Sequence, residues 1–233
     1  MRPLCGEGLP LEPPSPSHPL GTTPLGEDAL CALAAGLWTS LEVAAVSYLT
    51  SFALLTALHY LSFARKGVLA EALSDLLLSL PRLPLLVLLG VKVTLSPLLV
   101  GALVGALASS AGVKVIKEAA ERLREQPFAL ASFASGASPG EAWRLHGPRN
   151  ALELVSAYAG LSSAIAIYAE AAISALGLED PSTPSLGRLA YLVLNTPGAA
   201  LTEAGAAQLL ASALSTVAVA EVVRRAWRLL RAF

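Results

Sequence analysis

Long runs of apolar residues, separated by short polar breaks, alternate along most of this chain. A helix that crosses the hydrocarbon core of a membrane needs about 20 mainly apolar residues at a rise of 1.5 Å per residue. Several runs reach this length, which predicts an all-α polytopic membrane helical bundle of about five transmembrane helices. The predicted spans cover residues 41–64, 76–92, 96–113, 152–178 and 205–223.

Polar residues and prolines set the limits of the first three spans. The run at 41–64 follows an Ala/Leu-rich stretch from Asp28 that suits the membrane interface. The next apolar block, 84–113, is too long for one untilted helix. Lys92 and the pair Ser96–Pro97 interrupt it, since proline lacks an amide donor and disfavours helix at the residue before it. We therefore predict a hairpin of two helices in this region.

Two polar segments lie outside the predicted spans. Residues 1–27 are rich in Pro and Gly and have no apolar core of a signal peptide, so they form an external segment before a membrane domain at 28–233. Residues 114–150 begin with mixed charges at helical spacing, which predicts a helix that extends out of the membrane. Breaks follow at Gly136 and at the pair Pro139–Gly140. A short projecting helix or a solvated connecting loop fits this pattern.

The composition supports a membrane location. Hydrophobic residues make up 55% of the chain and charged residues 14%, whereas a soluble domain has about 25% charged residues. This excludes a disordered chain, a nucleic-acid-binding protein and most soluble enzymes. The net charge of -1 gives no overall field that would attract polyanions.

The positions of the basic residues predict the orientation. With Asp28 outside, thirteen Lys and Arg residues fall on the cytoplasmic side and three, Arg2, Lys92 and Arg188, fall outside. The positive-inside rule favours this arrangement. We predict a multi-pass protein of the cell (plasma or inner) membrane with its N-terminus outside and its C-terminus in the cytoplasm.

No known catalytic or metal-binding motif is present in the sequence. There is no G-x-x-x-x-G-K-[ST] phosphate loop, so the chain does not hydrolyse ATP unaided. There is no H-E-x-x-H motif, and His18, His59 and His146 are too dispersed to form a ligand set. The two cysteines, Cys5 and Cys31, exclude a disulfide framework, and they can pair with each other only if both lie outside. We expect no enzyme activity, no cofactor and no metal in this chain.

Acidic residues inside the predicted spans are candidates for function, because a carboxylate within a membrane is costly unless it is paired or wetted. Glu42 lies near the outer end of its helix, and Glu153 can pair with Arg149 one turn earlier. Glu170 lies deeper, and it either forms a hydrogen bond between helices or lines a polar path. Small residues that allow close packing share this helix: Ala157, Gly160, Ala164 and Ala171.

Separated motifs then occur in a recognisable order. The first is the external run from His18 to Asp28, HPLGTTPLGED, which Thr39-Ser40-Leu41 follows. Asp75 with Leu80-Pro81 comes next, and then Gly136-Ala137-Ser138 with His146 and Asn150. The most specific is AEAAISALGL at 169–178, followed by PSTPSLG at 181–187.

These motifs resemble those of the inner-membrane permease subunits of dipeptide/oligopeptide ABC transporters, of the C-type partner in the permease heterodimer. The resemblance extends from about His18 to the C-terminus. It implies the fold of type I ABC importer permeases and a subunit that translocates di- or oligopeptides delivered by an external solute-binding protein. The implied partners are a second permease subunit and two ABC ATPase subunits, which bind ATP and Mg²⁺.

The resemblance also implies three groups of functional residues. The loop that docks on the ATPase, the EAA loop of the family, corresponds to Ala134, Gly136, Ala137, Ser138, Glu141, His146 and Asn150. The translocation path and its helix packing correspond to Glu170, Ser174 and Gly177. The external motif corresponds to Gly21, Thr22, Gly26 and Asp28.

Three features depart from the family pattern. The first spanning helix of the family is missing, so we expect either a mis-assigned start or a helix supplied by another subunit. Thr23 and Glu27 replace the family's Asp and Arg, which removes or reverses a charge pair. Leu130-Ala131-Ser132 stands where Glu-Ala-Ala is common, and Phe133 stands where Arg is common.

Two alternatives to transport follow from the sequence. A non-transporting scaffold or assembly subunit derived from the permease fold accounts for the departures. An intramembrane enzyme needs Glu42, His59 and Glu170 to meet at one depth. The transported substrate, which in related permeases is a dipeptide, a longer peptide, a nickel complex or an oligosaccharide, cannot be read from these residues.

Overall fold

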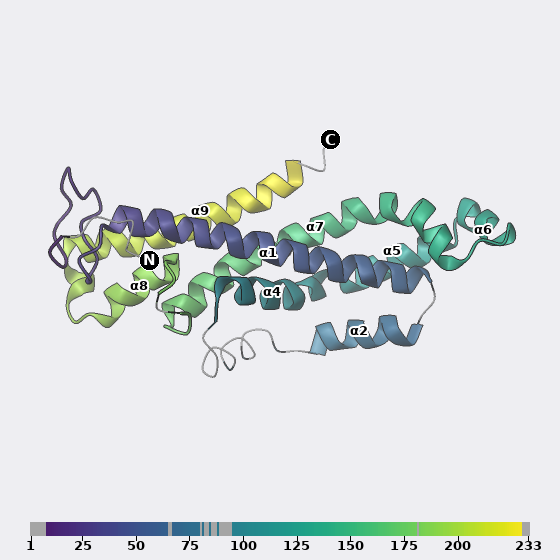
Figure 1. The fold of residues 1–233 in the computed structure, drawn as a ribbon, viewed down its shortest axis with the longest axis horizontal. Helices are drawn as coiled ribbons and strands as arrows, with labels where there is room; N and C mark the ends of the chain where they lie inside the picture. Colours follow the sequence, from purple (N-terminus) through teal and green to yellow (C-terminus); the bar gives the residue numbers. More distant parts are fainter. Residues whose placement is uncertain are drawn as a thin grey trace.

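The chain forms an elongated bundle of helices that run roughly along one axis (Figure 1). The computed structural model describes residues 8–64, 67–79, 81, 84, 88, 95–180 and 182–229. Within these ranges the chain forms helices and no β-strand, with only isolated bridges at Thr22–Asp28 and Leu95–Glu179. The predicted helical-bundle class is therefore confirmed.

The described helices follow one another in a simple order. They are α1 (Ala29–Phe63), α2 (Gly67–Ser79), α4 (Pro97–Ala108), the 3₁₀ turn η1 (Ser109–Gly112), α5 (Val113–Arg124), α6 (Pro127–Ala134), α7 (Pro139–Ala175), α8 (Leu186–Asn195), the 3₁₀ turn η2 (Ala199–Leu201) and α9 (Glu203–Leu229).

Four helical stretches of the described residues are long and apolar enough to cross a membrane. They are Ala29–Phe63, Pro97–Arg124, Pro139–Ala175 and Glu203–Arg225. The predicted spans 41–64, 96–113, 152–178 and 205–223 fall within or largely within these stretches. The predicted span 76–92 overlaps α2 only at 76–79, and most of its remaining residues lie outside the described part of the chain.

Two helices begin earlier than the apolar pattern predicts, because capping residues set their starts. Asp28 caps α1 by accepting a hydrogen bond from the amide of Cys31 at 2.8 Å. Ser138 and Glu141 form a capping box at the start of α7, in which Pro139 is the first helical residue. Proline suits this position because the first amides of a helix have no partner inside the helix. The pair Pro139–Gly140, expected to break a helix, therefore begins one.

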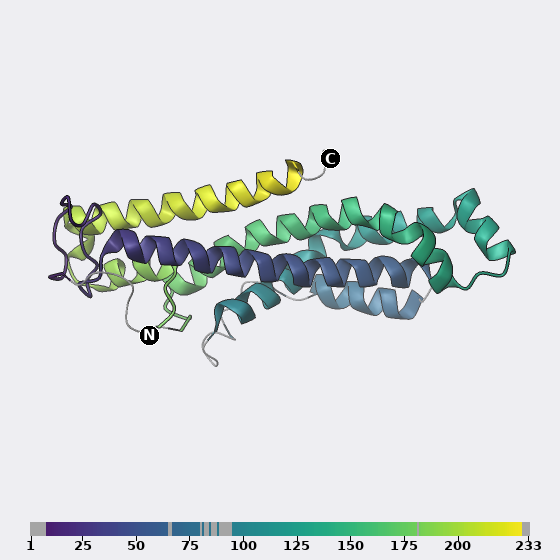
Figure 2. The same ribbon diagram turned by 45° about the horizontal axis from the view of Figure 1, so that its top comes forward.

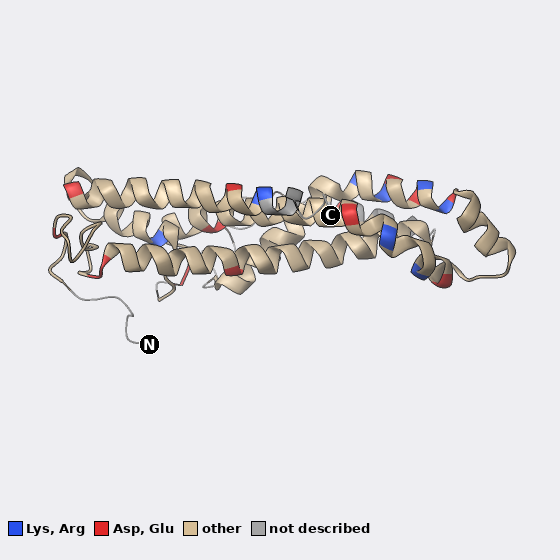
Figure 3. Cartoon of the chain, turned by 90° about the horizontal axis from the view of Figure 1, so that it is seen from above, with Lys and Arg blue, Asp and Glu red and all other residues tan. Residues whose placement is uncertain are grey.

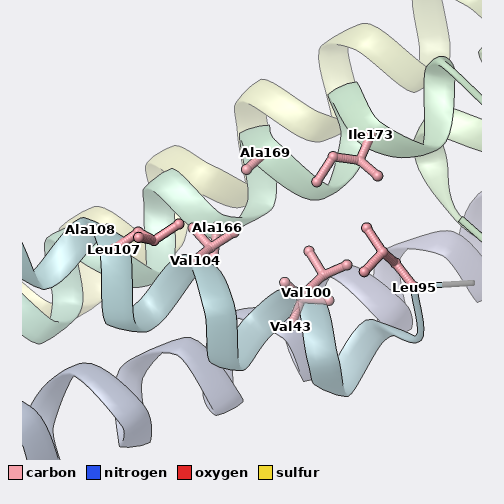
Figure 4. Packing of buried hydrophobic residues seen from close by; sticks show 9 residues of the cluster. All are labelled: Val43, Leu95, Val100, Val104, Leu107, Ala108, Ala166, Ala169 and Ile173. Atoms are coloured by element: carbon pink, nitrogen blue, oxygen red, sulfur yellow. The ribbon is translucent and has the colours of Figure 1, made fainter. Parts of the chain in front are cut away.

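Small residues bring α1 and α4 into close contact. A Cβ added to Gly101 would lie 2.8 Å from the carbonyl oxygen of Val43, and one added to Gly105 would lie 2.5 Å from that of Ser47. Both distances are below van der Waals contact, so only glycine allows this approach of the two backbones. Val100 and Val104 of α4 then pack with side chains of α1 and α7 in the main apolar cluster (Figure 4).

Serine hydroxyl groups link α1 to α7 within the bundle. Ser47 Oγ donates a hydrogen bond to the carbonyl oxygen of Ser162 at 3.2 Å, and the hydroxyls of Ser51 and Ser162 are 3.0 Å apart. All three residues are buried. Helices in a membrane associate through such close packing and interhelical hydrogen bonds, because lipid provides no hydrophobic driving force between them.

The two ends of the bundle differ in structure and in charge. Residues 8–28, α8, η2 and the starts of α1 and α9 gather at one end (Figures 1 and 2), which we call the α8 end. The ends of α1 and α5, the helix α6 and the start of α7 form the other, which we call the α6 end. Lys and Arg residues concentrate toward the α6 end (Figure 3). The prediction that this end is cytoplasmic remains a prediction.

The pairing of Cys5 with Cys31, which the sequence left open, falls partly outside the described residues. Cys5 is not among the described residues, so this pairing stays a prediction. Cys31 lies in the first turn of α1, at the α8 end.

We predict that Gly105→Leu destabilises the bundle, because the new side chain meets the backbone of α1 at Ser47. Overpacking of this kind costs about 1–3 kcal/mol, so the melting temperature in detergent should fall by roughly 2–12 °C. Ala53→Leu is the matched control, since Ala53 lies on an exposed face of α1. An equal effect of both substitutions on the melting temperature would contradict the assigned helix contact.

Candidate functional site

The predicted site residues occupy both ends of the bundle. Residues of the predicted ATPase-docking loop lie at the α6 end, and those of the external motif lie at the α8 end (Figure 1). Glu170, Ser174 and Gly177 lie in the last part of α7 and directly after it, toward the α8 end. The structure therefore separates the first group from the other two along the length of α7.

A tight turn between α6 and α7 shapes the α6 end. Gly136 has φ +92°, a conformation that side chains with a Cβ rarely adopt. The amide of Ala137 donates to the carbonyl oxygen of Ser132 at 3.0 Å, and Glu141 Oε2 accepts from the amide of Ser138 at 2.8 Å. The first bond closes the turn. Ser138 Oγ also accepts from the amide of Glu141 at 3.4 Å, so this capping box satisfies two amides at the start of α7.

Side-chain contacts hold α6 against the start of α7. The His146 Nε2 atom lies 3.0 Å from the hydroxyl oxygen of Ser132, and its ring is 4.8 Å from that of Phe128. Ala129, between these two residues of α6, is fully buried. His146, predicted as a docking residue, thus positions α6, while Ala134 and Asn150 are exposed.

Three contacts connect this end to the end of α1. The Trp143 Nε1–H group donates to His59 Nδ1 at 3.0 Å, and the Trp143 ring meets that of Tyr60 edge-on at 5.5 Å. Arg124 donates to the carbonyl oxygen of Phe63 at 2.6 Å. The interpretation of His59 as a packed, hydrogen-bonded histidine agrees with this geometry. An open pocket of about 450 Å³ lies here, lined by Tyr60, Ser138, Gly140, Glu141, Trp143 and Arg144.

Apolar side chains remain exposed on this end. Phe128 and Leu130 of α6 expose 47% and 53% of their surface, and Leu145 of α7 exposes 71%. Exposed apolar residues that are grouped in this way mark interaction surfaces. We call these three residues with Gly136 the α6 surface.

The external motif forms a compact cap at the α8 end. Gly21 and Gly26 have φ of +70° and +82°, and a Cβ on either residue would collide with a carbonyl oxygen, that of Glu12 or of Gly8. The carbonyl oxygen of Thr22 accepts a hydrogen bond from Gln208 Nε2 of α9 at 2.8 Å. The motif therefore has a structural role that attaches the N-terminal segment to α9.

Hydrogen bonds of His18, Thr23 and Asp28 also stabilise this cap. His18 Nδ1 lies 2.7 Å from Asp28 Oδ2. Thr23 and Glu27, which replace a charge pair of the family, form a local turn in which the Thr23 hydroxyl accepts from the amide of Glu27 at 3.2 Å. Partial burial raises the pKa of Asp28, but the stronger combined effect of its hydrogen bonds with His18 and the Cys31 amide lowers that pKa below its usual range.

A buried polar cluster lies beside the cap. Glu170 is fully buried, and its Oε2 accepts a hydrogen bond from Ser40 Oγ of α1 at 3.1 Å. Ser174 and Ser185 share a hydrogen bond between their hydroxyls. Gly177, with φ +72°, ends α7 and lies against the ring of Tyr191. We call Glu170, Glu179, Ser40, Ser174 and Ser185 the buried acidic cluster.

Glu179 is the member of this cluster that the sequence reasoning missed. It lies outside any apolar helix, so nothing in the hydropathy pattern marks it as buried, although its exposed fraction is only 6%. Burial raises the pKa of its carboxyl group above the usual range. Glu179 follows Gly177 by two positions, and a turn at this glycine was the one sequence feature that could have predicted its burial.

The three residues of the proposed intramembrane enzyme do not meet. His59 contacts Trp143 at the α6 end, whereas Glu170 contacts Ser40 on the same helix α1. Ser40 and His59 are nineteen positions apart, which corresponds to roughly 28 Å of helix. Glu42 is exposed. This arrangement offers no common reaction centre.

The chain has distant relatives among known proteins. No family model matches the chain. It is similar to provisionally named peptide permease proteins from Brucella abortus biovar 1, Brucella suis biovar 1 and Brucella melitensis biotype 1, each 30% identical over 171 residues. Each match covers 72% of this chain and 57% of the relative, so the chain spans little more than half the length of these curated relatives.

The four apolar helices and the similarity to permease proteins together identify a multi-pass membrane protein.

We predict that Asp28→Asn reduces the acid sensitivity of the cap. Because the pKa of Asp28 is lower in the folded protein, its contribution to stability is full above the unfolded value near 3.8 and is lost as the pH falls through the folded value. Hydrogen exchange at the Cys31 amide, measured between pH 6 and 3, should accelerate less on acidification in the variant, once intrinsic rates are subtracted. Asp75→Asn, at an exposed position, is the control and should behave as the wild type.

Proposed function

We propose that this chain is the membrane-spanning permease subunit, of the C-type, of an ATP-driven ABC importer for di- or oligopeptides. The observation that carries the proposal is the short helix α6, held at one end of a bundle of apolar helices similar to peptide permeases. An external solute-binding protein delivers the peptide at the α8 end, and the ATPases act at the α6 end.

The α6 surface is the proposed docking element for an ATPase subunit. Its turn at Gly136 is tight, and the hydrogen bond between Ser132 and His146 holds α6 against α7. The start of α7 is in turn bonded to α1 through Trp143 and His59. ATP binding to the partner can shift the permease between two states only if it stabilises one of them more than the other. A displaced α6 then moves α7 and, through Trp143 and His59, α1.

The proposed partners fit different parts of the surface. A second permease subunit faces α9, of whose apolar segment only 17% is buried within the chain. Leu210, Leu214 and Val217 of this helix are exposed. Two ABC ATPase subunits bind ATP and Mg²⁺, and this chain itself holds no cofactor in the proposal. The N-terminus lies outside, and the C-terminus lies in the cytoplasm.

A non-transporting scaffold is the second candidate, and the exposed Leu130 favours it. Leu130 stands where the family has a glutamate, so the α6 surface is more apolar than the family pattern implies. An apolar surface suits a permanent partner as well as a cycling ATPase.

Purification in mild detergent tests the importer proposal. The tagged chain, expressed in its native host, should retain a second permease and one or two ATPases, and the reconstituted complex should take up a labelled peptide when ATP and the binding protein are supplied. Recovery of a stable complex without an ATPase would contradict the importer and favour the scaffold.

We predict that Gly136→Asp uncouples ATP hydrolysis from transport. Its φ of +92° strains any side chain, and the added charge faces the docked ATPase, so peptide uptake should fall roughly tenfold or more while the complex still inserts. Gly198→Asp is a matched control, because Gly198 has φ +76°, equally open space around its Cα and a place at the opposite end. Equal losses of uptake in both variants would show that backbone strain alone is responsible.

A further inference from the structure

Two carboxyl groups of the buried acidic cluster lie close together without a basic partner. Glu170 is fully buried, and Glu179 exposes 6% of its surface. The negative charge of Glu179 acts on the carboxyl group of Glu170. Among the described residues, no Lys, Arg or His forms an ion pair with either carboxylate.

The oxygens of these groups are largely without hydrogen-bond partners. Ser40 donates to Oε2 of Glu170, but Oε1 of Glu170 and both carboxylate oxygens of Glu179 accept no hydrogen bond from a described residue. Buried polar atoms are nearly always satisfied in folded proteins, and a buried charge needs a compensating charge. Three such carboxylate oxygens in one cluster are therefore neutralised either by protons or by a cation.

Hydroxyl groups from other segments surround the two carboxylates. The Ser185 hydroxyl lies near both of them, and that of Ser174 lies near Glu179. These two hydroxyls bond to each other. The Asp180 carboxylate accepts hydrogen bonds from Ser182. Arg188 donates to Ser185 Oγ with its backbone amide, and its guanidinium forms no ion pair with a described residue.

We propose that Glu170 and Glu179, with the hydroxyls of Ser40, Ser174 and Ser185, bind one divalent cation of the calcium type. Carboxylate and hydroxyl oxygens are hard ligands, and the cluster offers four of the first and three of the second. Calcium takes 6–8 oxygen ligands in adaptable geometry, whereas magnesium requires a near-ideal octahedron. Two carboxylates supply the matching charge of a divalent ion.

The cluster joins segments that are far apart in the sequence. Ser40 belongs to α1, Glu170 and Ser174 belong to α7, Glu179 follows α7, and Ser185 caps α8. A bound ion would fasten the connection between α7 and α8 to α1. The inference rests on these contacts alone and not on the proposed transport function.

Calcium titration of the purified full chain tests the site. The protein is stripped with EGTA in detergent, and its melting temperature is then followed as Ca²⁺, Mg²⁺ or Na⁺ is added at constant ionic strength. A ligand at about 100 times its Kd should raise the melting temperature by roughly 5–10 °C. Equilibrium dialysis with radioactive calcium should give one ion per chain.

Substitution of the carboxylates separates metal binding from packing. Glu170→Gln and Glu179→Gln should each abolish the calcium-dependent rise and the bound ion, and in EGTA each should be at least as stable as the wild type, because a buried charge is removed without a change of size. Glu42→Gln, at an exposed position of α1, should leave binding and stability unchanged.

Other outcomes would overturn the proposal. If the melting temperature does not respond to Ca²⁺ but rises as the pH falls, the carboxyl groups are neutralised by protons instead of a metal. If Na⁺ stabilises the protein as strongly as Ca²⁺ does, the site is not divalent. If the glutamine variants bind calcium as the wild type does, the ion lies elsewhere.

Discussion

The contact between α1 and α7 is the interaction on which the rest of the structure depends. Ser47 and Ser51 of α1 bond to Ser162 of α7 in the middle of the bundle. Further α1–α7 hydrogen bonds occur near both ends, from Trp143 to His59 and from Ser40 to Glu170. Because the two helices are joined at three levels, they are held in register along most of their length.

The contact between α1 and α7 also connects the two ends of the bundle mechanically. The α6 surface is attached to the first turns of α7, and the buried acidic cluster lies near its last turns. A helix is stiff along its axis, so a force applied at α6 reaches Glu170 by displacement of α7 against α1. In the proposed importer, this is the route from the ATPase to the end that receives the peptide.

The candidate site was only partly predictable, and particular residues show why. Glu170 stands out because a carboxylate in an apolar run needs a partner. Glu179 and Ser185 lie in the polar segment between α7 and α8. The sequence pattern of such a segment predicts neither its burial nor its contact with α7. His146 carried a family resemblance to a docking loop, but its bond to Ser132 requires the turn at Gly136 to bring α6 back over α7.

The sequence by itself determined the helical membrane class, the positions of most apolar spans and the places where glycine must turn the chain, because hydropathy and backbone freedom are local properties. Only the tertiary structure decided which hydroxyl meets which carboxylate. It also separated His59 from Glu170 along α1. These outcomes depend on contacts between residues more than a hundred positions apart, such as Ser40 with Glu170, and no local pattern encodes such contacts.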